Sequence, residues 1–195
     1  MKNYTTTVEK PLLEIRYDSD LPSPREDDNL GYFITMDRNH FSPDKHPTLE
    51  AIVKETSEEA DSQSIHMALI KLRIKEDLNE KVLAIYPVVK YEHGNVSYRR
   101  GTQHSFDYSN NGFYIVTDRT AKIVGTPKKL FEKVIDQELE TYTKWANGDV
   151  YGYTLYSKDG EVEDSCCGFY DIDDIKENLP DEWTDEDLSE YLKTS

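Results

Sequence analysis

The sequence contains little cysteine and no long hydrophobic run, and each absence excludes a class of protein. No segment approaches the roughly 18 consecutive apolar residues of a membrane-spanning helix. The first residues also lack the charged-then-apolar pattern of a secretory signal peptide. Cys166 and Cys167 are the two cysteines, and neighbouring cysteines rarely pair because the resulting ring is strained. We therefore expect a reduced, cytoplasmic protein that makes no membrane contact.

Basic residues are scarce relative to acidic ones. The chain has 39 Asp and Glu against 23 Lys and Arg, a net charge of −16. Residues 159–195 contain 14 acidic residues and two lysines, so this segment carries −12 and the first 158 residues carry only −4. Such a surface repels the phosphates of nucleic acids and membranes and favours basic partners. The alternative is a solvated acidic tail that only increases solubility.

The longest periodic segment predicts one amphipathic helix. Pro127 suits the first turn, where its missing N–H is not needed, and Gly148 suits a left-handed C-cap. The side chains that share the apolar face at helical spacing are Phe131, Ile135, Leu139 and Tyr142. A strand, a hairpin and a second strand are predicted over residues 148–170.

Shorter segments complete the prediction. Strands are expected at residues 12–17, 32–36, 81–91, 96–98 and 112–116, with Pro87 marking an edge or a bulge. Helices are expected from Thr48 onward and over residues 64–80. The predicted buried face of the second helix consists of Ile65, Leu69, Leu72 and Leu78.

The mixed order of elements predicts an α+β fold with a mostly antiparallel sheet. At 195 residues one domain is expected, over residues 1–170, because a chain of this length can bury a sizeable core. Residues 171–195 are expected to form an acidic helical extension docked on that domain. Its predicted docking side chains are Trp183, Leu188, Tyr191 and Leu192.

Three groups of motifs follow one another along the chain. They are PREDDNLG at residues 24–31; YEHG at 91–94 with FD at 106–107 and GFYIV at 112–116; and GDVYGY at 148–153 with DSCCGFY at 164–170. In this order they resemble the motifs of a family of small phage and mobile-element proteins. The resemblance covers most of the chain and implies a phage or mobile-element origin. Asp27, Phe106 and Cys167 stand where the family pattern has tryptophan, so a ligand platform built from those tryptophans is in doubt.

Polar residues of the motif loops are the candidates for chemistry. These residues are Arg25, Asp28, Asn29, His93, Asp107, Asp149, Asp164 and Cys166. Asp28, His93, Asp107 and Asp149 could gather as a hard-metal or general acid–base cluster. The alternative is that such residues cap turns and bond the local backbone. No metal or cofactor is predicted, and Asp28, His93 and Asp149 stay as catalytic candidates.

Other chemistries are disfavoured by the residues themselves. Cys166 has acidic neighbours that would oppose a thiolate, so a buried structural cysteine is the expectation. Residues 148–152 lack the Lys-Ser/Thr of a phosphate-binding loop. Residues 98–100 are too short to form a basic, aromatic-interleaved face for nucleic acid.

The sequence therefore favours an interaction protein over an enzyme. Its expected partner is the basic cleft of a host nucleic-acid-handling defence enzyme, as in an anti-restriction or anti-CRISPR inhibitor that mimics DNA. The alternatives are a small hydrolytic or nucleotide-modifying enzyme and a structural accessory of a phage. The predicted partner-binding residues are Asp171, Asp173, Asp174, Glu177, Asp181, Glu182, Asp185, Glu186, Asp187 and Glu190.

Overall fold

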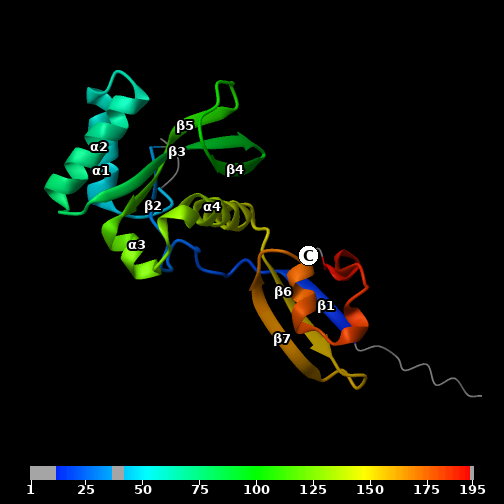
Figure 1. Cartoon of the computed structure of the whole chain (residues 1–195). Helices are drawn as coiled ribbons and strands as arrows, with labels where there is room; N and C mark the ends of the chain where they lie inside the picture. The colour runs from blue at the N-terminus through cyan, green and yellow to red at the C-terminus, as the bar shows by residue number, and fades with distance from the viewer. Residues whose placement is uncertain (1–11, 37–41, 194–195) are drawn as a thin grey trace, which may run out of the picture. The chain divides into compact units, whose positions relative to one another are not determined.

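The computed structural model describes residues 12–36 and 42–193 of the 195-residue chain. Helices and two antiparallel sheets confirm the predicted α+β class (Figure 1). The chain divides into two compact units: unit 1 comprises residues 1–22 and 144–195, and unit 2 comprises residues 23–143. The division therefore does not follow the boundary expected after residue 170. Among the described residues, no helix is both long and apolar enough to cross a membrane.

Unit 1 is built on a three-stranded sheet with β6 (Tyr151–Tyr156) between β1 (Leu12–Tyr17) and β7 (Val162–Phe169). The hairpin of β6 and β7 confirms the predicted strand pair. Leu13 lies opposite Leu155 and Ile15 opposite Tyr153. Because side chains alternate along a strand, these four apolar residues share one face of the sheet.

The C-terminal segment covers that apolar face (Figure 1). It consists of three 3-10 helices, η2 (Asp173–Asn178), η3 (Asp181–Trp183) and η4 (Leu188–Tyr191), in place of the predicted short helices. Its buried side chains are Ile175, Leu179, Trp183 and Leu188, with Tyr191 and Leu192 partly buried beside them. The predicted docking residues are confirmed. Residues 171–193 thus supply half of the core of unit 1, which is why no boundary falls after residue 170.

Unit 2 contains a four-stranded sheet in the order β2-β5-β3-β4. The strands are β2 (Tyr32–Thr35), β5 (Tyr108–Thr117), β3 (Val82–His93) and β4 (Asn95–Arg100). The predicted hairpin between β3 and β4 is confirmed, with Gly94 at a φ of 83°. Pro87 lies in an interior strand, but the β3–β4 register begins one residue later, at Val88. A register shift in the β3–β5 pair follows between Val88 and Lys90, as expected near a strand proline.

Helices cover both faces of this sheet. Phe113 packs with α1 (Pro47–Glu59) and α2 (Gln63–Asp77), whereas the hydroxyl of Tyr114 bonds Glu138 of α4 (Phe131–Asn147). Neighbouring strand residues point to opposite faces, so α1 and α2 lie on one side of the sheet and α4 on the other (Figure 1). A short 3-10 turn, η1 (Lys128–Leu130), precedes α4. The predicted apolar face of α4 is confirmed, and Gly148 has the left-handed φ of 76°.

Three local predictions for unit 2 were incomplete or wrong. The N-cap of α1 is His46, whose Nδ1 accepts a hydrogen bond from the Leu49 N–H at 3.2 Å, so Thr48 already lies inside the helix. No helix was predicted where α3 (Asp118–Val124) forms. The predicted face of α2 is wrong, because Ile65 and Leu72 are 43% and 54% exposed.

The buried stripe of α2 instead runs through His66, Ile70 and Ile74. The imidazole Nε2 of His66 lies 2.9 Å from the Val53 carbonyl oxygen. Its ring packs edge-on against Phe113 at 4.8 Å between centroids. A histidine whose hydrogen bond is satisfied can occupy a core position, and the leucine pattern alone did not indicate this.

Candidate functional site

The ten predicted partner-binding carboxylates lie on and between the 3-10 turns of unit 1. Nine of them are exposed and Glu186 is half-buried. The apolar residues between them point into the core, with Trp183 and Leu188 at most 1% exposed. The turns therefore hold the carboxylates on a folded support, in contrast to a solvated tail. We call this surface, which spans residues 171–190, the acidic turns.

Two lysines offset part of the charge of the acidic turns. Lys176 pairs with Asp173 at 2.9 Å, and Lys144 lies 3.7 Å from Asp171. Asp187 accepts hydrogen bonds from the hydroxyl and the N–H of Ser189, which lower the pKa of its carboxyl. These contacts leave the net charge of the surface strongly negative at neutral pH.

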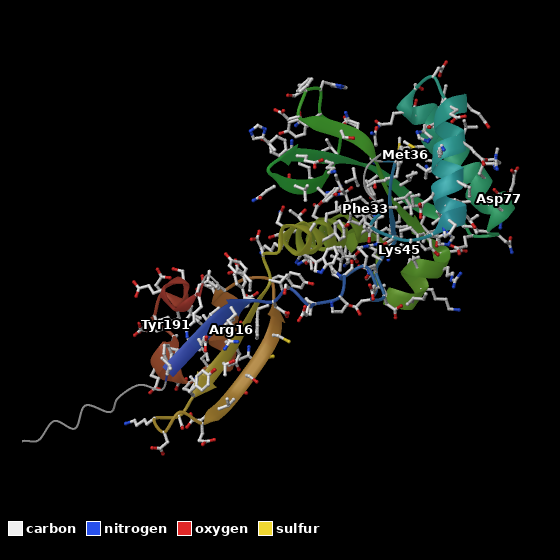
Figure 2. The ribbon with its side chains drawn as sticks, turned by 180° about the vertical axis from the view of Figure 1, so that it is seen from behind. Arg16, Phe33, Met36, Lys45, Asp77 and Tyr191 are labelled. Carbon is white, nitrogen blue, oxygen red and sulfur yellow. The ribbon has the colours of Figure 1, made fainter. Side chains whose placement is uncertain are left out.

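Glu14 of β1 binds Lys193, which follows the acidic turns, and so connects this segment to the sheet. Its carboxylate accepts from Arg16 at 3.1 Å, from the Tyr156 hydroxyl at 3.1 Å, and lies 2.8 Å from the Lys193 ammonium. The hydrogen bonds from Arg16 and then Lys193 lower the pKa of Glu14 to about 2. The Lys193 N–H also donates to the Ile15 carbonyl at 2.8 Å. Figure 2 shows Arg16 on β1 and Tyr191 on the last turn within this unit.

In unit 2, the first motif loop is organised by a buried guanidinium. The Arg25 side chain is 2% exposed. Its Nε and Nη2 donate to the two carboxylate oxygens of Asp44 at 2.7 and 2.8 Å, and Nη1 donates to Glu138 at 2.9 Å. Burial opposes the charge, but the hydrogen bonds and attraction of Asp44 outweigh it and raise the pKa of Arg25 above its ordinary value.

The same carboxylates also fix the backbone that enters β2. Glu138 accepts from the Leu30 N–H at 2.9 Å, and Asp44 accepts from the Phe33 N–H at 2.6 Å. The Tyr114 hydroxyl donates to Glu138 and accepts from the Gly31 N–H at 3.0 Å. Burial and the adjacent Glu138 raise the pKa of Tyr114, so it stays a neutral donor.

Two features explain the spacing of the PREDDNLG motif. Asn29 accepts from Arg25 Nη1 at 2.9 Å and donates its amide N–H groups to the Pro24 and Asp27 carbonyls. A Cβ at position 31 would lie 2.5 Å from the Ile115 carbonyl oxygen, so glycine is required there.

The partners of this network were missed by sequence reasoning. They are Asp44, Glu138 and Tyr114, which lie outside the motif loop. The one available signal was Arg25 itself, a candidate residue of the motif loop.

Within unit 2, members of the predicted acid–base cluster lie on different elements. Asp28 lines a cleft of about 280 Å³ beside His46, whereas His93 lies at the tip of the β3–β4 hairpin. The backbone carbonyl of Asp107 accepts from the Glu92 N–H, and Asp149 belongs to unit 1. Across the part of the chain that the structure describes, no three His, Cys, Asp or Glu residues are placed to hold a metal ion. The metal-cluster hypothesis therefore lacks geometric support in these residues.

The expectation of a buried cysteine is wrong. Cys166 and Cys167 are both free and exposed, because β7 is the outer strand of its sheet. The charge of Asp18 raises the pKa of the Cys167 thiol, which opposes a reactive thiolate. Asp164 accepts from the Tyr153 hydroxyl at 2.6 Å and from the Ser165 N–H at 2.8 Å. Its contacts are those of a structural residue of the hairpin.

The three positions where the family pattern has tryptophan lie on different parts of the chain. Asp27 lines the cleft beside His46, and Cys167 lines a hollow of unit 1 over Gly152. Phe106 is fully exposed in the loop before β5. The two unit 2 positions are thus in different surroundings, a cleft wall and an open loop.

Comparisons with known proteins add no further constraint. A scan against protein-family models finds no match for the chain, and searches of curated proteins and of solved structures also find none.

Proposed function

We propose that this protein is an acidic interaction protein that binds the basic cleft of a host nucleic-acid-handling defence enzyme and inhibits it. The proposal includes the anti-restriction or anti-CRISPR role and the phage or mobile-element origin that the motifs imply. One observation carries it: the acidic turns present nine exposed carboxylates on a support anchored by buried apolar side chains.

A folded support reduces the conformational entropy that the carboxylates lose on binding. A disordered acidic tail would lose conformational freedom on binding, whereas carboxylates on a folded support have already lost it. A basic cleft that normally binds phosphates attracts such a surface by the same long-range electrostatics. Binding should therefore compete with DNA and weaken steeply as the salt concentration rises.

The alternative enzyme hypothesis has less support. Its candidates Asp28 and His93 lie on different parts of unit 2, and Arg25 and Asn29 are occupied by contacts that build the loop. The phage accessory hypothesis gains no specific observation. We therefore develop only the inhibitor proposal.

The test neutralises charge without disturbing the core. One variant converts four exposed carboxylates of the acidic turns to amides: Asp174→Asn, Glu177→Gln, Asp181→Asn and Glu182→Gln. The matched control makes four such changes on exposed residues of unit 2: Glu58→Gln, Glu59→Gln, Asp61→Asn and Glu76→Gln. Both variants have the same net charge. Each protein is used to capture partners from host lysate, and captured nucleases and methyltransferases are assayed for DNA cleavage or modification.

The proposal predicts that wild-type protein and the unit 2 control inhibit a captured enzyme, and that duplex DNA competes with them. The variant of the acidic turns is expected to bind at least about tenfold more weakly, because several charge contacts are lost together. Equal inhibition by all three proteins would place the interface elsewhere. Failure to capture or inhibit any nucleic-acid enzyme would contradict the proposal itself.

A further inference from the structure

Unit 2 has a cluster of half-buried and exposed rings at the hairpin end of its sheet. Tyr91 of β3 pairs with Tyr108 of β5, with ring centroids 5.0 Å apart. His93 stacks on Tyr91 at 6.5 Å, and the guanidinium of Arg99 lies 5.3 Å from the Tyr108 ring centre. These contacts place side chains from three adjacent strands on one face of the sheet. We call Tyr91, His93, Arg99, Phe106 and Tyr108 the aromatic end.

Phe106 is the most exposed large apolar residue of the described chain. It is 102% exposed, whereas the other exposed large hydrophobics range up to 61%. The loop that carries it is held beside the rings, because the Tyr108 N–H donates to the Ser105 carbonyl and the Glu92 N–H donates to the Asp107 carbonyl. A fully exposed phenyl ring on a structured loop can serve as an aromatic anchor in a protein interface.

The charge of this region favours a second copy of the chain as its binding partner. Residues 88–110 carry three basic and two acidic residues, in a chain with a net charge of −16. Two copies of the chain repel each other most strongly at the acidic turns of unit 1, whereas this near-neutral end belongs to the less charged unit 2, where two copies can approach. Arg99 lies over the Tyr108 ring and the exposed Asp107 precedes Tyr108 in the chain, so this region presents both signs of charge. A two-fold axis that passes between the two charges would place each opposite its complement.

We propose that the aromatic end is a self-complementary interface through which two copies of this chain form a reversible dimer. Phe106 of each copy packs against the Tyr91 and Tyr108 rings of the other. Arg99 of each copy faces Asp107 of the other. This inference concerns unit 2 alone and does not depend on the function proposed for the acidic turns.

The first test is sedimentation equilibrium of the full-length chain at about 0.3 M NaCl, which screens the mutual repulsion of the copies. Wild-type protein is expected to shift from monomer to dimer as its concentration rises. Phe106→Ser is expected to weaken the dimer at least about tenfold, as loss of a central aromatic anchor does. Leu72→Ser, which removes another exposed apolar side chain of unit 2, is expected to leave the dimer unchanged.

A charge exchange tests the two-fold pairing. Arg99→Asp places two carboxylates on each contact, and Asp107→Arg places two cations there, so each variant alone should remain monomeric. Mixed together, the two variants should form a heterodimer. In it, the carboxylate introduced at position 99 of one copy faces the guanidinium introduced at position 107 of the other, and the remaining contact pairs the unchanged Asp107 with the unchanged Arg99. Native mass spectrometry distinguishes the heterodimer by mass, and far-UV circular dichroism checks that both variants are folded.

Three outcomes would overturn the inference. The wild-type chain could stay monomeric at every concentration, which would leave the aromatic end for a different partner. Phe106→Ser could dimerise as strongly as wild type, which would place the interface elsewhere. The mixed charge variants could fail to associate, which would exclude the proposed pairing of Arg99 with Asp107.

Discussion

Arg25 shows how a single buried charge can organise a loop. The N–H groups of its guanidinium donate to Asp44, Glu138, Asn29 and the Gly31 carbonyl, so they bind partners in several directions. Removal of one partner from a buried ion pair is destabilising, because it leaves the other charge uncompensated. The motif residues around Arg25 therefore need no ligand to explain them.

We expect Arg25→Met to destabilise unit 2 by about 3–5 kcal/mol, because the partly buried Asp44 and Glu138 would lose their buried cation. The measurement is urea unfolding followed by far-UV circular dichroism, since both tryptophans, Trp145 and Trp183, belong to unit 1. Arg119→Met is the control. Its side chain is 68% exposed, so the expected change is within about 1 kcal/mol. Similar unfolding midpoints for both variants would show that the network is not stabilising.

Among the helices and strands, α2 shows that a regular leucine pattern can indicate the wrong face. The helix has apolar residues on more than one side, and only contact with α1 and β5 selects the stripe that is buried. His66 belongs to this stripe because its imidazole has a backbone partner in α1. Leu72 and Ile65 then lie toward solvent.

Substitutions on the two faces of α2 should differ in their effect on stability. Ile70→Ala is expected to cost about 2–4 kcal/mol, because the side chain is fully buried and its removal leaves a cavity. Leu72→Ala, at a 54% exposed position, is expected to stay within about 0.5 kcal/mol. Thermal and urea unfolding of the two variants check this. A larger loss for Leu72→Ala would contradict the described orientation of the helix.

Over the molecule as a whole, the two units differ in charge. Unit 1 contains 19 acidic and seven basic residues, whereas unit 2 contains 20 acidic and 16 basic residues. The acidic surface and half of the core of unit 1 come from the same C-terminal segment. Charge and stability therefore cannot be separated by deleting that segment, and side-chain neutralisation is the appropriate test of the proposed function.

A chain that ends at Tyr170 is expected to lose the fold of unit 1, because Leu13, Ile15, Tyr153 and Leu155 would be exposed to water. Hydrogen exchange measured by mass spectrometry should show lost protection in β1 and β6 and retained protection in β3 and β5. The variant with four amides in the acidic turns should keep protection in all four strands. Retained protection of β6 in the truncated chain would show that the turns are dispensable for folding.

Elements whose signal is local could be predicted from the sequence without the fold. The apolar face of α4 follows from helical spacing, the β3–β4 hairpin from Gly94, and the C-terminal docking residues from isolated apolar side chains among carboxylates. Backbone dihedral preferences and periodic burial act over a few residues, so a single sequence contains them.

Contacts between residues that are far apart in the sequence could be identified only from the tertiary structure. Asp44 and Glu138 are 19 and 113 residues from Arg25, and nothing in their own neighbourhoods marks them as its partners. The same holds for the buried stripe of α2, the exposed cysteines of the outer strand and the ring contacts of the aromatic end. In each case burial and pairing are set by the packing of other elements, which local propensity does not specify.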